Sequence, residues 1–218
     1  MDIPEAYHRF RALIEQPQGE VRLAEAALLI AQAEYPDLDV EAYLHRLDAM
    51  AGTIKQQLGL ELEPRRIVAT INAYLYNEQG FRGNLDDYYD SRNSFLNEVL
   101  DRKTGIPISL SVVYIEMARQ VGLPITGVSL PGHFIVQYAT QVDTFWIDPF
   151  HDGTILTRED CAARLRQTYG HEVGWQDVFL TPVSDRDILR RMLHNLKGIY
   201  MQQRDYTRAL GVVEWLLL

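Results

Sequence analysis

The sequence predicts an α+β fold with a helical N-terminal region, a core that contains a small antiparallel sheet, and a C-terminal helical hairpin. Apolar residues recur at helical spacing through residues 1–80 and again in residues 183–218. Between them, residues 81–180 include a stretch whose period is that of strands. These strands follow one another without intervening helices, which favours antiparallel pairing over parallel crossovers. We therefore expect three regions with these bounds.

The N-terminal region, residues 1–80, is expected to form a bundle of four helices. An apolar stripe at helical spacing runs from Tyr7 to Ile14, and an Ala- and Leu-rich segment at 20–34 follows it. Asp39 is a good N-cap for the third helix, because its carboxylate can accept from free backbone N–H groups. Pro64 occupies the favoured first position of the fourth.

The core and the tail contain both kinds of period. The expected elements are helices at 95–102, 109–121 and 157–169 and strands at 125–130, 134–138 and 145–148. Thr157 is predicted to cap the last of these helices. The tail is expected to hold two helices that are separated near Asp205.

Composition excludes several classes of function. The formal net charge is −9 and no segment is strongly basic, so we expect no nucleic-acid partner. The N-terminus lacks a basic region followed by an apolar run, and no apolar stretch is long enough for a membrane span, so we expect a cytoplasmic protein with no membrane partner. The single cysteine, Cys161, excludes an intramolecular disulfide and a Cys-based zinc cluster. No His residues pair at metal-ligand spacing, and no metal or cofactor is expected.

Three residues form a candidate catalytic constellation. Ser109 is predicted at a helix N-terminus, His133 at the start of a strand, and Asp148 at the end of the next strand. A helix N-terminus stabilises an anionic nucleophile, a His takes its proton, and an acid orients the His. The alternative is structural, with Ser109 as an N-cap and the other two residues in turns.

A second candidate site is the polar and aromatic segment before the first core helix. Its members are Tyr88, Tyr89, Asp90, Asn93 and Ser94. Such side chains can line a ligand-binding cleft beside His133. They can equally satisfy the backbone of their own loop. The sequence leaves both interpretations open.

Four stretches of the core resemble the SirB-type transglutaminase-like proteins. They are YYDSRNSFLN at 88–97, GIPISLS at 105–111, PGHF at 131–134 and DPF at 148–150. The resemblance implies a papain-like core, in which a nucleophilic Cys at a helix N-terminus faces a sheet that carries His and Asp. His133 and Asp148 fall on the latter two positions. The nucleophile position falls at about residues 107–109, where there is no Cys, and Cys161 comes after both His133 and Asp148.

The tail resembles one tetratricopeptide repeat. The matching residues are Asn195, Leu196, Tyr200, Asp205, Tyr206, Ala209, Leu210 and Val213. A plain helical hairpin is the alternative. One repeat cannot bury its own apolar face, so we expect it to dock on the core or to continue into further repeats in a longer protein.

These observations favour a transglutaminase-like protein that lacks the nucleophilic Cys and binds a protein or peptide without catalysis. A missing thiol and a repeat of a type that makes protein contacts support this expectation. The alternative is a hydrolase or acyltransferase that uses a Ser109-His133-Asp148 triad, because a hydroxyl stands close to the position of the thiol.

Overall fold

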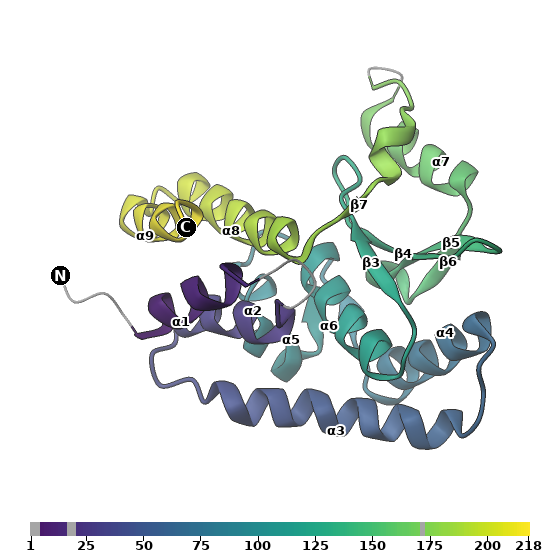
Figure 1. The fold of residues 1–218 in the computed structure, drawn as a ribbon. Helices are drawn as coiled ribbons and strands as arrows, with labels where there is room; N and C mark the ends of the chain where they lie inside the picture. Colours follow the sequence, from purple (N-terminus) through teal and green to yellow (C-terminus); the bar gives the residue numbers. More distant parts are fainter. Residues whose placement is uncertain (1–4, 17–20, 171–172) are drawn as a thin grey trace.

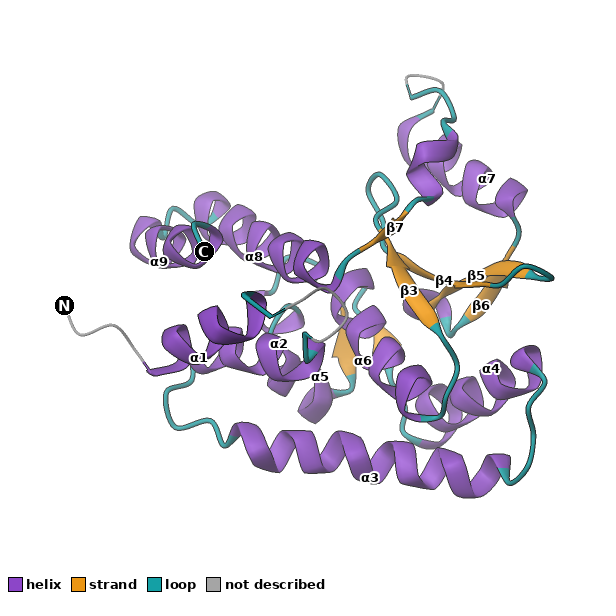
Figure 2. Cartoon of the chain, viewed as in Figure 1, coloured by secondary structure: helices purple, strands orange, loops and turns teal. Residues whose placement is uncertain are grey.

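The computed structural model describes residues 5–16, 21–170 and 173–218, and it shows the α+β architecture that the sequence predicts. A small twisted sheet lies at one side of the molecule, with helices against both of its faces (Figure 1). Most of the remaining chain is helical (Figure 2). Among the helices of the described ranges, none has the length and apolar character that crossing a bilayer requires.

The four expected N-terminal helices are present. They are α1 (Glu5–Ile14), α2 (Leu23–Gln32), α3 (Val40–Leu58) and α4 (Pro64–Asn72). The start of the predicted second helix falls partly on residues 17–20, outside the described residues. Asp39 caps α3, accepting from the Ala42 N–H at 3.0 Å, as its sequence position predicts. Beyond Asn72 the helix continues as a π-helix, η1 (Ala73–Glu78), which the sequence did not indicate.

Two helices form the interior of the molecule. Every residue from Leu23 to Ala31 of α2 is buried; all are apolar except Glu25, which pairs with Arg9 and Arg22. The second is α6 (Pro107–Gln120), which follows α5 (Leu96–Arg102) and packs on α2, α3 and the sheet. The prediction that this helix begins at Ser109 is wrong. It begins at Pro107, because proline at the first helical position loses no hydrogen bond and has a suitable φ.

The main sheet has five antiparallel strands in the order β6-β5-β4-β3-β7. Their bounds are β3 (Ile125–Val128), β4 (Ile135–Ala139), β5 (Thr144–Asp148), β6 (Thr154–Leu156) and β7 (Pro182–Val183). The sequence predicted the central three and missed the two edge strands. The loop between β3 and β4 is longer than predicted, so His133 lies in this loop and does not open the strand, a correction to the sequence analysis. A separate parallel pair joins β1 (Arg82–Gly83) to β2 (Thr104–Gly105).

Side chains on the two faces of the sheet belong to two apolar clusters. Val136 of β4 and Ile147 of β5 belong to the large core that includes α6. Ile135, on the opposite face of β4, packs in a smaller cluster with Cys161 of α7 (Arg158–Tyr169). Thr157 caps α7 as predicted, accepting from the Asp160 N–H at 3.1 Å.

The C-terminal hairpin consists of α8 (Asp185–Gln202) and α9 (Tyr206–Leu216), which are antiparallel neighbours (Figure 1). Asp205 caps α9, at the break that the sequence predicts. Trp215 of α9 packs against Tyr7 and Phe10 of α1, with ring centroids 5.7 and 4.9 Å apart. The hairpin therefore belongs to the same apolar core as the N-terminal helices and α6.

Candidate functional site

The side chain of Asp148 is the centre of the most connected polar cluster near the predicted site. Asp148 ends β5, is fully buried, and precedes the short 3-10 helix η3 (Pro149–His151). Its Oδ1 atom accepts from the backbone N–H groups of Phe150 and His151, at 3.1 and 3.3 Å. One carboxylate oxygen therefore fixes the turn that follows the strand.

The other oxygen, Asp148 Oδ2, is surrounded by three side chains. His133 Nε2 and His151 Nδ1 both lie 2.9 Å from it, and Arg164 Nη1 of α7 lies 2.8 Å from it. Arg164 Nη1 also lies 2.9 Å from His151 Nδ1. Because that nitrogen cannot both donate to Asp148 and accept from Arg164, and the guanidinium already donates to the carboxylate, we assign the proton of His151 to Nδ1.

These donors stabilise the charged form of Asp148. Burial alone would raise the pKa of its carboxyl group. The hydrogen bonds from His133 and His151, together with the positive charge of Arg164, outweigh burial and hold the pKa of Asp148 well below its usual range. The carboxylate is therefore ionised at neutral pH and orients both imidazole rings.

His133, Asp148 and His151 also carry three atoms that can ligate a metal ion, all within 4.8 Å of one another. His and Asp are ligands that zinc accepts. However, the Arg164 guanidinium lies on the same carboxylate oxygen and supplies the positive charge that a metal ion would bring. A metal ion would have to displace it, so the donor set fits an ion poorly.

Hydrogen bonds from residues of α4 and η1 hold the turn that carries Phe150 and His151, and a residue of α6 supports one of these donors. Tyr76 donates its hydroxyl to the Pro149 carbonyl at 3.0 Å, and Asn72 donates to the Gly153 carbonyl at 2.8 Å. Tyr114 of α6 donates to Asn72 Oδ1 at 2.9 Å. The π-helix η1 therefore has a structural role, because it places the Tyr76 hydroxyl within hydrogen-bond distance of the turn.

Ser109 does not hydrogen-bond to His133 or Asp148 in the structure. It is fully buried in the first turn of α6. Its Oγ atom donates to the Asn93 carbonyl at 2.6 Å and accepts from the Ile106 N–H at 3.1 Å. Ser109 is therefore not the N-cap that the structural alternative expected: it is the third residue of α6, and its hydroxyl accepts from the N–H of the N-cap residue, Ile106, and joins the helix to the loop before α5. The structure brings together two members of the predicted triad, while the third makes its hydrogen bonds elsewhere.

Cys161 lies on the far side of the sheet from α6. Its side chain is fully buried among apolar residues of the smaller cluster. Burial raises the pKa of the Cys161 thiol to about 12, although the positive charge of Arg164 opposes the shift. A thiol with so high a pKa is protonated at neutral pH and is a poor nucleophile.

Two tyrosines of the second candidate site extend the surface beside His133. The ring of Phe150 lies 6.0 Å from that of His133 and 6.4 Å from that of Tyr88. Tyr88 in turn lies 5.4 Å from Tyr89, whose side chain is 60% exposed. A line of neighbouring aromatic rings, which we call the aromatic strip, therefore runs from Tyr89 through Tyr88 and Phe150 to His133. Its exposed part is Tyr88 and Tyr89, since Phe150 is buried in the core beneath them.

The other three members of that site face inward. Asn93 is fully buried, and its amide donates to the Asp87 carbonyl at 2.7 Å and accepts from Asn84 at 3.0 Å. Asp90 caps the short η2 helix (Ser91–Asn93), accepting from the Arg92 N–H at 3.0 Å. Ser94 is buried as well. The predicted group thus divides into an exposed aromatic pair and a set that makes hydrogen bonds within the loop or is buried beneath it.

Sequence reasoning did not single out His151 or Arg164, and it named Phe150 only as part of the DPF motif. The DPFH sequence places His151 three residues after Asp148, and this spacing was a usable signal. Arg164 comes from a different helix, and nothing local relates it to Asp148.

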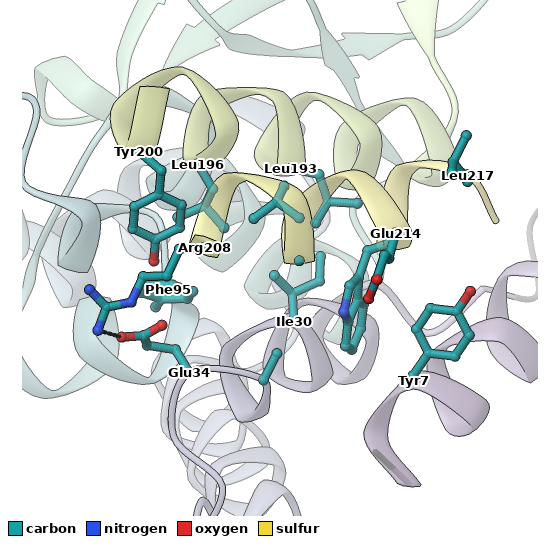
Figure 3. A pocket seen from close by; sticks show the side chains of 14 residues that line it. Tyr7, Ile30, Glu34, Phe95, Leu193, Leu196, Tyr200, Arg208, Glu214 and Leu217 are labelled. Atoms are coloured by element: carbon teal, nitrogen blue, oxygen red, sulfur yellow. Dashed lines mark ion pairs between the residues drawn. The ribbon is translucent and has the colours of Figure 1, made fainter. Parts of the chain in front are cut away.

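A separate apolar pocket of about 490 Å³ lies between the C-terminal hairpin and the helices α1 and α2. Its wall includes Leu193 and Leu196 of α8, and Ile30 of α2 lies opposite (Figure 3). At one side the Arg208 guanidinium pairs with Glu34 at 2.8 Å. This pocket contains no member of the Asp148 cluster.

Comparison with known proteins places this geometry in a family. The profile of the transglutaminase-like superfamily matches residues 41–194. A UPF0162 protein of Xylella fastidiosa is 39% identical over 89% of this chain and 70% of its own length. The UPF0162 protein YchA of Escherichia coli is 27% identical over 95% of the chain and 77% of its own length. F-box only protein 21 of mouse is 29% identical over 88% of the chain, but over only 34% of its own length.

No solved structure matches the chain significantly. The family profile runs from α3 into the middle of α8 and includes the His133–Asp148 pair and the start of α6. The chain therefore belongs to the transglutaminase-like superfamily, together with the UPF0162 proteins.

Proposed function

We propose that this protein is a non-catalytic transglutaminase-like protein of the SirB type that binds a protein or peptide at the aromatic strip beside His133. The observation that carries the proposal is the state of the α6 N-terminus, where the superfamily places its thiol. Here Pro107, Ile108 and Ser109 occupy that position, and all three are buried. The remaining His–Asp pair has no activated nucleophile hydrogen-bonded to it within the described residues.

The geometry of the acid and the base supports a binding role. Asp148 orients His133 as the carboxylate of a catalytic triad would, yet the same oxygen also binds His151 and Arg164. The pair therefore stabilises the loop before β4 and the turn after β5. These two segments carry His133 and the buried Phe150, and the exposed Tyr88 lies beside Phe150, so the pair rigidifies the support of the aromatic strip.

The C-terminal hairpin supports the same role. We propose that α8 and α9 form a tetratricopeptide-like unit and that the protein works in the cytoplasm with a protein partner. One relative, F-box only protein 21, contains the matching region as about a third of a longer chain. This fits a domain that is used as a module.

The alternative, a hydrolase or acyltransferase with a Ser109-His133-Asp148 triad, receives less support. Its nucleophile must reach a ring nitrogen of His133, whereas Ser109 Oγ donates to Asn93 and accepts from Ile106. Freeing the hydroxyl would leave a buried N–H and a buried carbonyl without partners, at a cost of about 1–3 kcal/mol each.

Peptide display on the immobilised protein tests the proposal. We expect selected peptides to bind the wild type, and to bind the Tyr89→Ala variant at least about tenfold more weakly. The melting temperature of the variant is expected to equal that of the wild type. The same preparation is assayed for hydrolysis of p-nitrophenyl acetate and of peptide amides, and we expect no rate above buffer. Hydrolysis that is lost in both Ser109→Ala and His133→Ala would establish the alternative and overturn the proposal.

A further inference from the structure

The apolar pocket between the C-terminal hairpin and the N-terminal helices has the size of a small-molecule site. Its volume is about 490 Å³, and pockets that bind small ligands commonly hold ~300–1,000 Å³. Tyr7, Gly211 and Val212 line it and are only half-buried, so the pocket opens to solvent where they lie. Buried apolar side chains form the rest of the wall, namely Ile30, Phe95, Leu193, Leu196 and Trp215.

The charged groups of the pocket leave one carboxylate without a cation. At one side, Arg208 Nη2 lies 2.8 Å from Glu34 Oε1, and Arg208 Nη1 lies 3.1 Å from Asp205 Oδ2. Two carboxylates therefore already balance the guanidinium. Glu214 lies towards the other side (Figure 3), is exposed, and forms no ion pair with a basic side chain of the described residues. The net charge of these groups is negative, which is complementary to a cation.

Aromatic rings accompany the free carboxylate. Glu214 directly precedes Trp215 in α9, and the ring of Trp215 lies 5.7 Å from that of Tyr7. All three side chains line the same pocket. A cation beside a carboxylate gains Coulomb energy, and the ring of the half-buried Tyr7 can add a cation–π attraction.

Gly211 keeps the pocket open on the side of α9. It lies within this helix, its φ is not positive, and a Cβ atom at this position would meet no other atom within 4 Å. Glycine in a helix interior is less stable than alanine, and here neither close packing nor backbone conformation requires it. A larger side chain at this position would occupy the space of the pocket.

We propose that this pocket binds a small organic cation with an apolar body, such as a protonated amine on an aliphatic or aromatic group. The apolar body packs on Leu193 and Leu196, and the ammonium group lies beside Glu214 and the ring of Tyr7. The pocket contains no member of the Asp148 cluster or of the aromatic strip, so this inference does not depend on the proposed binding function.

Three probes of similar shape and different charge test the proposal. 4-Phenylbutylamine is a cation at neutral pH, 4-phenylbutan-1-ol is neutral, and 4-phenylbutanoate is an anion. Each is titrated into the full 218-residue protein while the indole N–H signals of its three tryptophans are followed by NMR. We expect the amine to shift the Trp215 signal, to bind at least about threefold more tightly than the alcohol, and to leave the anion the weakest ligand. Trp146 and Trp175 pack against the smaller apolar cluster, outside the pocket, and their signals serve as internal controls.

Two glycine substitutions in the hairpin test whether the ligand occupies the pocket. Gly211→Leu places a side chain in the pocket. Gly198→Leu adds the same side chain at an exposed position of α8 outside the pocket, where a Cβ atom also meets no other atom within 4 Å. We expect amine binding to be lost in the first variant and retained in the second. Equal binding by the two variants overturns the proposal.

Glu214→Gln tests the charge and keeps the shape of the pocket, so it decides this point even if Gly211→Leu is poorly folded. We expect this variant to bind the amine no more tightly than the alcohol. Glu159→Gln, at an exposed position of α7 outside the pocket, is expected to bind both probes as the wild type does. Equal affinity of the wild type for amine and alcohol, or an unshifted Trp215 signal with all three probes, overturns the proposal. Self-association of the wild type that Gly211→Leu abolishes would show that a second copy covers the pocket, and it overturns the proposal as well.

Discussion

The two halves of the predicted site differ in where their polar atoms point. At the N-terminus of α6, the Ser109 hydroxyl bonds to backbone groups inside the molecule, and no part of its side chain reaches solvent. At the end of β5, Asp148 is equally buried, but its partners His133, His151 and Arg164 all extend towards the surface. One half is closed, and the other still presents titratable groups.

This difference is the one that the proposed binding function requires. An enzyme of this type needs a nucleophile and a base facing each other across one cleft. In this chain His133 and Asp148 contact each other, whereas Ser109 makes a packing contact between α6 and the Asn93 loop. On this description, changes of the buried polar groups, Asp148 among them, affect stability, whereas changes of the exposed side chains in the open half affect binding alone.

The largest effect is expected for Asp148→Asn. The substitution removes the charge that His133, His151 and Arg164 share and leaves the guanidinium half-buried without a carboxylate. We expect a loss of about 3 kcal/mol in the free energy of unfolding, measured by urea denaturation. Asp143→Asn is the control, since its pair with Arg65 is exposed and is worth less than about 1 kcal/mol. Equal effects of the two variants would contradict the central role of the Asp148 cluster.

The same variant has a pH signature. The pKa of Asp148 is depressed in the folded state, so below the ordinary value of 3.8 the unfolded chain binds the proton more readily. The stabilisation is therefore fully present above about pH 5 and declines as the pH falls below about 4. In Asp148→Asn this part of the acid dependence is expected to disappear, which denaturation curves between pH 2 and 6 will show.

Asn93→Ala is expected to cost about 2 kcal/mol, the second largest effect. The amide links the Asp87 carbonyl to Asn84, and its loss leaves buried polar groups without partners. The measurement is thermal unfolding followed by circular dichroism. A melting temperature within a degree of the wild type, combined with lost peptide binding, would instead show that Asn93 belongs to the binding surface.

Ser109→Ala is expected to cost about 1–2 kcal/mol because it orphans the Ile106 N–H and the Asn93 carbonyl. Ser111 offers a matched control on the same helix. It is also fully buried, but its hydroxyl only adds a bond to the Pro107 carbonyl at 2.7 Å. We expect Ser111→Ala to cost about 0.5 kcal/mol, since that carbonyl already accepts within the helix. Urea denaturation of both variants measures the difference, and a stable Ser109→Ala protein that loses a hydrolytic activity would reopen the alternative function.

The sequence predicted those parts of the fold that depend on local pattern. Helix and strand periods located the interior helices and the three central strands, and cap residues such as Asp39 and Thr157 placed helix ends correctly. The edge strands β6 and β7 were missed because they contain three and two residues and exist only through pairing with the sheet. Short segments of this kind carry too few residues for a period to be detected.

The site was predictable to the same degree. His133 and Asp148 follow from motifs, and the structure places their side chains 2.9 Å apart. The start of α6 was misplaced by giving Ser109 the capping position, although Pro107 is the stronger start signal. Arg164 comes from α7, and its approach to Asp148 depends on how this helix packs. No local pattern contains that information.

The smallest effect on stability, and the sharpest test of the open half, is expected for Tyr89→Ala. Tyr89 and Tyr206 are both 60% exposed, but Tyr89 lies in the aromatic strip and Tyr206 begins α9. Each substitution is expected to change the free energy of unfolding by less than about 0.5 kcal/mol, because neither side chain is buried. Binding of display-selected peptides, measured by fluorescence anisotropy, is expected to weaken at least about tenfold in Tyr89→Ala and to stay unchanged in Tyr206→Ala. Equal weakening in both variants would show that the peptides adhere to exposed aromatic side chains in general, and the contrast between a closed half and an open, binding half of the site would then be wrong.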